Sequence, residues 1–162
     1  MFLKAVKAVG VKAKKESWHY GDSHGMPPCS DKTISCDRLP ARALYDLGYK
    51  DQPRGGITCN DFPTYMYNWG FIGTKKQSEI KPGAIVAVGD MEGGADDIDH
   101  IFVVEKYNSK TGICSKYDAG SDYRISQACH FENVPLMEWS DRHFIAAWNV
   151  PSNLKGATPQ KQ

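Results

Sequence analysis

The first half of the chain places apolar residues at helical spacing. Phe2, Val6 and Val9 fall near one face of residues 2–15, which predicts a helix that Gly10 weakens. The stretch SWHYGDSHGMPP follows, where glycines and prolines break any period, and we expect a loop there.

The clearest helical pattern begins after residue 36. Its apolar positions are Leu39, Ala43, Leu44 and Leu47. Gly48 supplies a C-terminal stop, and Ser35 or Thr33 can cap the start. Because Pro40 lacks an N–H and restricts the residue before it, we expect an irregular turn around Cys36 or a helix that begins near Pro40. Residues 60–69 predict a further helix, which Gly70 ends.

Beyond residue 80 the pattern is typical of strands. KPGAIVAVG joins a Pro-Gly turn to a run rich in isoleucine and valine, and DHIFVVEKYNSKTGICSKYDAG holds two strand-like runs around the hairpin loop NSKTG. HFIAAWNV predicts a last strand. Helices followed by strands favour an α+β fold with an antiparallel sheet.

Length favours one domain, because a single core accommodates a chain of this size. We assign residues 1–150 to it and interpret the polar residues 151–162 as a linker-like tail.

Hydrophobic content of 41% and a net charge of +1 are ordinary for a globular protein and give no overall basic excess for nucleic acid or a membrane surface. No apolar run reaches the roughly 18 residues of a membrane span, and lysines interrupt the N-terminus, so no signal peptide is predicted. We therefore expect synthesis in the cytoplasm.

The chain has five cysteines with no CxxC clustering: Cys29, Cys36, Cys59, Cys114 and Cys129. Neither a metal site nor a disulfide framework is predicted, and no cofactor is expected. Cys36 precedes the apolar helix, where backbone N–H groups and the helix dipole favour a thiolate. Asp37 opposes this effect, so a nucleophilic role needs a nearby imidazolium, and a buried core thiol is the alternative.

His100 opens the strand IFVVE and is the candidate partner of Cys36. If NSKTG closes a hairpin, antiparallel pairing places position 100 opposite positions 118–120 and brings Asp118 across from it. A carboxylate on one imidazole nitrogen with a thiol facing the other is the arrangement of cysteine hydrolases. A structural His-Asp pair is the other interpretation.

The blocks SCDRLPARALYDLGY, KPGAIVAV, DHIFVVEKY and KYDAGS together resemble the NlpC family of cell-wall cysteine peptidases, within the papain-like superfamily. The resemblance covers about residues 16–150 and implies a papain-like NlpC-type fold, whose N-terminal helices carry the nucleophile against a central antiparallel sheet. It implies Cys36 as nucleophile, His100 as base and Asp118 as orienter. The chain departs from the family at Asp37, where serine is common, and at Asp118, where histidine or another polar residue is frequent.

The same resemblance implies hydrolysis of an amide in the peptidoglycan stem peptide through a thioester, most often between D-glutamate and the third residue. The backbone N–H of Cys36 is the first candidate oxyanion donor. Further candidate substrate or oxyanion contacts are Tyr20, Trp18, Ser35 and Asp99. The acidic stretch GDMEGGADDID before His100 predicts a negative rim that attracts an amine of the substrate, with a calcium loop or a solvated loop as alternatives.

Other functions fit the same residues. A lysin of the CHAP type cuts the crossbridge or the sugar-to-peptide amide, a transferase resolves the thioester with an amine, and a non-catalytic wall-binding or phage structural module retains only the fold. The linker-like tail and the missing signal peptide favour a bacteriophage endolysin catalytic domain that acts at the cell wall. Its expected partners are peptidoglycan and a C-terminal wall-binding domain outside this chain, with a monomer as the expected state.

Overall fold

A computed structural model describes residues 1–21, 32–90, 94 and 96–154 of the chain. Within them it has four α-helices: α1 (Phe2–Lys15), α2 (Arg38–Asp46), α3 (Phe62–Asn68) and α4 (Asp122–Ser126). Two short 3-10 turns lie at Cys59–Asp61 and Gln77–Glu79. The three helices predicted from apolar spacing are confirmed, whereas the five-residue α4 was not predicted.

Local chemistry explains where α2 begins and ends. The helix starts at Arg38, two residues before the expected Pro40, after a turn at Cys36 and Asp37. Pro40 is tolerated because it lies in the first turn, where backbone N–H groups have no partner within the helix. Gly48 follows the helix with a φ of 108°, a left-handed conformation that glycine adopts without strain.

The strands form two sheets. β1 (His19–Tyr20) lies inside the stretch expected to be a loop and makes a short parallel pair with β2 (Thr33–Ile34), which follows that stretch; residues 22–28 of the stretch lie outside the described part. The larger sheet contains β3 (Ile72–Thr74), β4 (Ile85–Asp90), β5 (His100–Asn108), β6 (Ile113–Tyr117), β7 (His130–Pro135) and β8 (Arg142–Asn149). Its order is β3-β8-β4-β5-β6-β7, and every neighbouring pair is antiparallel. The expected α+β organisation is therefore confirmed.

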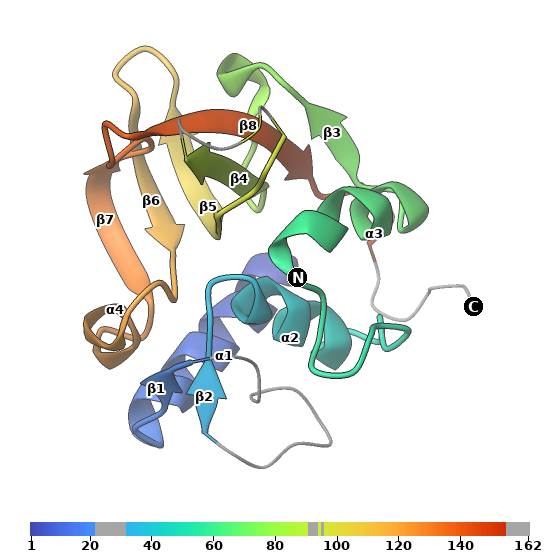
Figure 1. The fold of residues 1–162 in the computed structure, drawn as a ribbon, viewed down its shortest axis with the longest axis vertical. Helices are drawn as coiled ribbons and strands as arrows, with labels where there is room; N and C mark the ends of the chain where they lie inside the picture. Colours follow the sequence, from blue (N-terminus) through green and yellow to red (C-terminus); the bar gives the residue numbers. More distant parts are fainter. Residues whose placement is uncertain (22–31, 91–93, 95, 155–162) are drawn as a thin grey trace.

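Apolar residues lie on both faces of the central strands, which explains their near-continuous hydrophobic runs. Ile85, Ile101 and Val103 belong to a large core shared with the helices, while Val86 and Phe102 belong to a smaller cluster. Figure 1 shows α1 and α2 packed together beside one end of the sheet, with β5 beginning close to α2. This arrangement brings the start of α2 to the start of β5.

Two sequence features have a different role from the one expected. Gly10 does not weaken α1: a Cβ atom there would lie 2.3 Å from the carbonyl oxygen of Ala128, so glycine permits close packing against the turn after α4. In the tail, Leu154 is buried in the large core, and residues 155–162 lie outside the described part. Among the described residues, none of the helices has the length and apolar content to cross a bilayer.

Candidate active site

Three segments far apart in the sequence bring the predicted triad together. Cys36 lies in the turn that enters α2, His100 is the first residue of β5, and Asp118 directly follows β6. Val103 of β5 pairs with Tyr117 of β6, so the hairpin continues toward the His100 end as the sequence predicted. The Nε2 atom of His100 lies 3.0 Å from both carboxylate oxygens of Asp118.

The three side chains are withdrawn from solvent. Cys36 and His100 are each 6% exposed, and Asp118 is fully buried. Asp118 has a second fixed contact, because the backbone N–H of Gly120 donates to its Oδ1 at 2.9 Å. With Nε2 directed at the carboxylate, Nδ1 of the same ring remains for the sulfur of Cys36, with which His100 interacts by hydrogen bonding.

The charges favour a thiolate-imidazolium pair. A hydrogen bond from Cys59 and the adjacent His100 lower the pKa of Cys36 to about 5, against the opposing effect of burial. Burial disfavours a charged His100, but its hydrogen bonds and charge interactions with Asp118 and Cys36 raise its pKa to about 9. The pKa of Asp118 is held well below its usual range, despite burial, by His100 and two neighbouring cations. These shifts favour a Cys36 thiolate beside a His100 imidazolium at neutral pH.

Asp37 connects the turn that contains Cys36 to the loop before α3. Its Oδ2 accepts the backbone N–H of Cys59 at 3.0 Å, and its Oδ1 accepts the hydroxyl of Ser35 at 2.6 Å. Arg38, which is 3.3 Å from Asp37, donates to the carbonyls of Gly55 and Ile57. These contacts fix residues 55–59 against the entrance of α2.

Cys59 was not predicted to belong to the site. Its interaction with Cys36, together with burial and nearby negative charge, raises the pKa of Cys59 far above its usual range, so Cys59 stays neutral. No sequence motif identifies it, because only the folded chain brings residue 59 beside residue 36.

Two further sequence candidates are bonded within the protein. Ser35 was expected to contact the substrate or the oxyanion, but it is buried and its hydroxyl binds Asp37. Asp99 was expected on a negative rim, but its carboxylate accepts the backbone N–H of Asp90 and so stabilises the turn between β4 and β5. Both side chains therefore have partners within the protein that hold the backbone next to Cys36 and His100, and their assignment as substrate contacts stays a prediction.

Acidic side chains in the stretch before His100 also have partners within the protein. Asp97 accepts a hydrogen bond from Asn60 at 3.0 Å, and the same Asn60 accepts the backbone N–H of Ile98. Asp96 lies 3.6 Å from Lys75. Glu92 falls outside the described residues. Asn60 therefore anchors the segment before His100 to the turn that contains Cys59.

The two aromatic candidates differ in exposure. Tyr20 is 46% exposed, and its backbone pairs with Ile34, two residues before Cys36. Trp18 is only 7% exposed, belongs to the large core and donates its indole N–H to Glu16. Its ring is used in packing, and the candidate role of Trp18 as a substrate contact stays a prediction.

A hollow of about 520 Å³ opens beside the segment that precedes His100. Its walls are mainly apolar and include Pro63, Ile98, Ile145 and Trp148, with Lys75 and Asp96 at the polar part. This combination of an apolar surface and a few charged groups is typical of sites that bind extended organic ligands.

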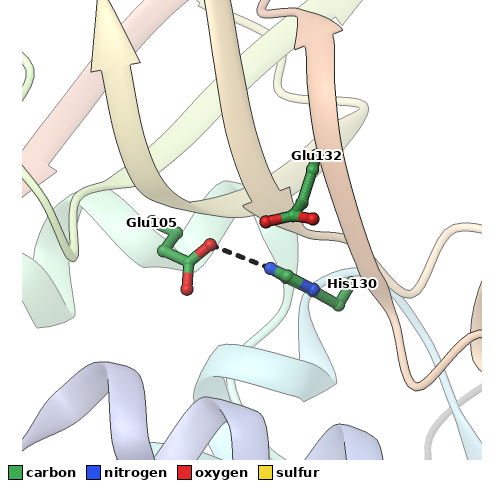
Figure 2. A group of neighbouring side chains, drawn as sticks. All are labelled: Glu105, His130 and Glu132. Carbon is green, nitrogen blue, oxygen red and sulfur yellow. Dashed lines mark hydrogen bonds and ion pairs between the residues drawn. The ribbon is translucent and has the colours of Figure 1, made fainter.

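Among the described residues, one group of side chains has the composition of a metal site. Figure 2 shows Glu105 on β5 with His130 and Glu132 on β7, and their potential ligand atoms lie within 4.8 Å of one another. However, Nε2 of His130 is already 2.8 Å from Glu105 Oε1, and both side chains are about one-third exposed. The group is explained as a surface ion pair, and we assign no metal to it.

Comparisons of the chain with protein-family models, with curated proteins and with solved structures found no match.

Proposed function

We propose that the protein is a peptidoglycan hydrolase: a cysteine endopeptidase with a papain-like fold of the NlpC type. The observation that carries the proposal is the convergence of Cys36 before α2, His100 at the start of β5 and Asp118 after β6, with a 3.0 Å contact between the last two. The sulfur has a lowered pKa and the imidazole a raised one, which is the charge state that nucleophilic cysteine catalysis requires.

The chemistry begins with attack of the Cys36 thiolate on the carbonyl carbon of an amide, forming a C–S bond. The carbonyl oxygen becomes an oxyanion, for which the backbone N–H of Cys36 is the first donor. The C–N bond breaks as His100 passes its proton to the leaving amine, which leaves an acyl thioester on Cys36. His100 then takes a proton from water, the hydroxide attacks the thioester, the C–S bond breaks, and the thiolate-imidazolium pair is restored.

The stem peptide of peptidoglycan is the proposed substrate, cut between D-glutamate and the third-residue diamino acid. The resemblance of the Cys36, His100 and Asp118 blocks to the NlpC family supports this choice. The apolar hollow bounded by Ile98 and Trp148 is the proposed place for part of the peptide, and exposed Tyr20 is the candidate second oxyanion or substrate contact.

The biological setting follows from the same resemblance. We propose a bacteriophage endolysin catalytic domain that acts at the bacterial cell wall as a monomer. A wall-binding domain beyond this chain is the proposed partner that keeps it on its substrate.

Product analysis tests the proposal. The protein is incubated with purified peptidoglycan of several chemotypes, and the soluble fragments are identified by mass spectrometry. We expect fragments ending in D-glutamate together with fragments beginning at the third residue. New termini in the crossbridge, or free stem peptides cut from the sugar, would instead assign CHAP-type activity.

Two variants serve as controls. Cys36→Ala should release no fragments from any wall. Cys114→Ala, which removes another buried thiol, should release the same fragments as the parent. If the parent releases nothing from every chemotype, the hydrolase proposal fails and the non-catalytic module is favoured.

A further inference from the structure

A buried lysine lies directly behind the candidate catalytic pair. Lys116 on β6 is fully buried, and its Nζ atom is 3.1 Å from Oδ2 of Asp118. The same ammonium forms an ion pair with Glu138 and lies 4.3 Å from the centre of the Phe102 ring. A buried ammonium is costly unless it is paired, so these partners explain how Lys116 is accommodated.

Arg124 of α4 extends the contacts into a network. Its Nη1 lies 3.5 Å from Oδ2 of Asp118, and its Nη2 lies 3.1 Å from Oε2 of Glu138. Positive and negative groups therefore alternate from His100 through Asp118, Lys116 and Glu138 to Arg124, which returns to Asp118. Each contact in such a network costs less side-chain conformational entropy than a separate ion pair, because neighbouring contacts already fix the side chain.

Trp139 connects this network to the histidine. Its ring meets that of His100 edge to face, at 5.2 Å between centres and 82° between planes. The ammonium of Lys116 lies 5.1 Å from the same Trp139 ring. The network thus contacts both the carboxylate that orients His100 and the ring that packs on it.

We propose that Lys116, held by Glu138, is a positioning residue that fixes the carboxylate of Asp118 and, through it, the orientation of His100 toward Cys36. Lys116 touches none of the reacting atoms. Its role is to keep both oxygens of Asp118 on Nε2 of His100, so that Nδ1 stays directed at the sulfur. A buried ion pair seldom adds net stability over apolar residues of similar size, which favours a positional role over a purely structural one.

The inference rests on the proposed function because it takes Cys36 to be the nucleophile. Its test, however, does not use peptidoglycan. The rate at which iodoacetamide alkylates Cys36 is measured against pH in the full chain, with the modified residue identified by peptide mass spectrometry. This rate follows the thiolate fraction. Several charged or titratable groups surround Cys36 and His100. They are Asp37 before α2, Cys59 before α3, Lys116 on β6, Asp118 after β6, Arg124 on α4 and Glu138 after β7.

Lys116→Met keeps the length of the side chain and removes its charge. The variant loses the Lys116 cation and the fixed position of the Asp118 carboxylate, which raises the pKa of Cys36. Alkylation of Cys36 near pH 6 should therefore fall about tenfold, because only about one-tenth of Cys36 is then a thiolate. Added to Asp118→Asn, the same substitution should cause little further change, because Lys116 acts through Asp118. An unchanged pH profile, or a full additional loss in the Asp118→Asn background, would overturn the proposal.

Glu138→Gln is the second variant and leaves the lysine in place. It removes the carboxylate that holds both Lys116 and Arg124, so we expect a smaller shift in the same direction. Lys116→Arg, which retains the charge, should recover most of the alkylation rate. The matched control is Glu105→Gln, which breaks an ion pair on the same sheet and should leave the profile unchanged. If neither Lys116→Met nor Glu138→Gln moves the profile in folded protein, Lys116 has no positioning role, whatever the protein does to peptidoglycan.

Discussion

Gly120 shows how closely the backbone surrounds the candidate catalytic histidine. A Cβ atom at this position would lie 2.8 Å from Cε1 of His100 and 2.9 Å from Oδ1 of Asp118. Any larger residue must therefore displace one of the two side chains whose mutual contact the site requires. The glycine of the DAG sequence thus has a steric role, which local turn propensity alone does not reveal.

Gly120→Ala should consequently inactivate the protein without unfolding it. A displacement of His100 by about 1 Å is enough to reduce turnover about a hundredfold. The measurement is the rate of peptide release from peptidoglycan, with a thermal melt to show that the variant is folded. Full activity in a folded variant would mean that the ring has more freedom than this geometry gives it.

Cys59 is the second residue whose effect is specific to the folded site. Because its thiol is the largest cause of the lowered pKa of Cys36, Cys59→Ala should raise that pKa and slow alkylation of Cys36 at about pH 5–6. Cys59→Ser retains a hydroxyl donor and should preserve most of the rate. Equal alkylation rates in the parent and in Cys59→Ala would show that His100 alone maintains the thiolate.

At this scale the sequence predicted the residues whose role has a local signature. Cys36 stands before a helix, and His100 and Asp118 stand at matching ends of a hairpin. Cys59 and Glu138 have no such signature, because their positions depend on loops that only the complete fold places. Lys116 had a usable signal: it is a charged residue two positions before Asp118 in a strand whose residues 114–117 are buried.

At the scale of elements, the start of α2 depends on its attachment to the loop before α3. Arg38 is buried and donates to the carbonyls of Gly55 and Ile57. Removing the guanidinium leaves these buried carbonyls without their partner, which costs about 1–3 kcal/mol for each group not rescued by water.

We therefore expect Arg38→Met to lower the free energy of unfolding by about 2 kcal/mol, measured by urea denaturation. Arg54→Met in the turn before α3 is the control, because Arg54 is exposed and an exposed substitution changes stability by about 0.5 kcal/mol or less. Equal effects of the two substitutions would contradict the specific role of Arg38.

The elements differ in how far the sequence reveals them. α1 to α3 were predicted because a buried face imposes a helical period on the sequence, and β4 to β6 and β8 because turn residues bound their apolar runs. β3 has only three residues, which is too short for a period. β7 is an edge strand with mixed exposure that ends at Pro135, and α4 has five residues, so neither carries an apolar pattern.

At the scale of the whole molecule, the buried charges make stability depend on pH. Cys36 and His100 carry one proton together in the folded state between about pH 5 and pH 9. Unfolded, they carry two protons below about pH 6.5, one up to about pH 8.5 and none above. Stability should therefore rise with pH from about 5 to 6.5, stay level to about 8.5 and fall slightly between about 8.5 and 9.

Melting temperature against pH measures this dependence. In Cys36→Ala the rise between about pH 5 and 6.5 should disappear, because folded and unfolded states then bind the same number of protons while His100 stays charged. The lowered pKa of Asp118 adds a stabilisation that is complete above about pH 4 and is lost as the pH falls further. A rise of the same size in Cys36→Ala would show that another group is responsible.

The sequence also predicted the α+β class of the molecule, since helices precede most of the strands. The order of the strands was not predictable. Placing β8 between β3 and β4 pairs segments more than 50 residues apart, and such pairing depends on the packing of the whole core.

The central claim is that a Cys36 thiolate, paired with His100, cleaves cell-wall peptide. The most direct test is peptide release from purified peptidoglycan between about pH 4 and pH 10 by the parent and by Cys36→Ala. The thiolate is present above its pKa of about 5 and the imidazolium below its pKa of about 9, so release by the parent should be high between these values and decline on both sides. Cys36→Ala should release nothing at any pH, and release by this variant at the parent's rate, or none by the parent at any pH, would contradict the claim.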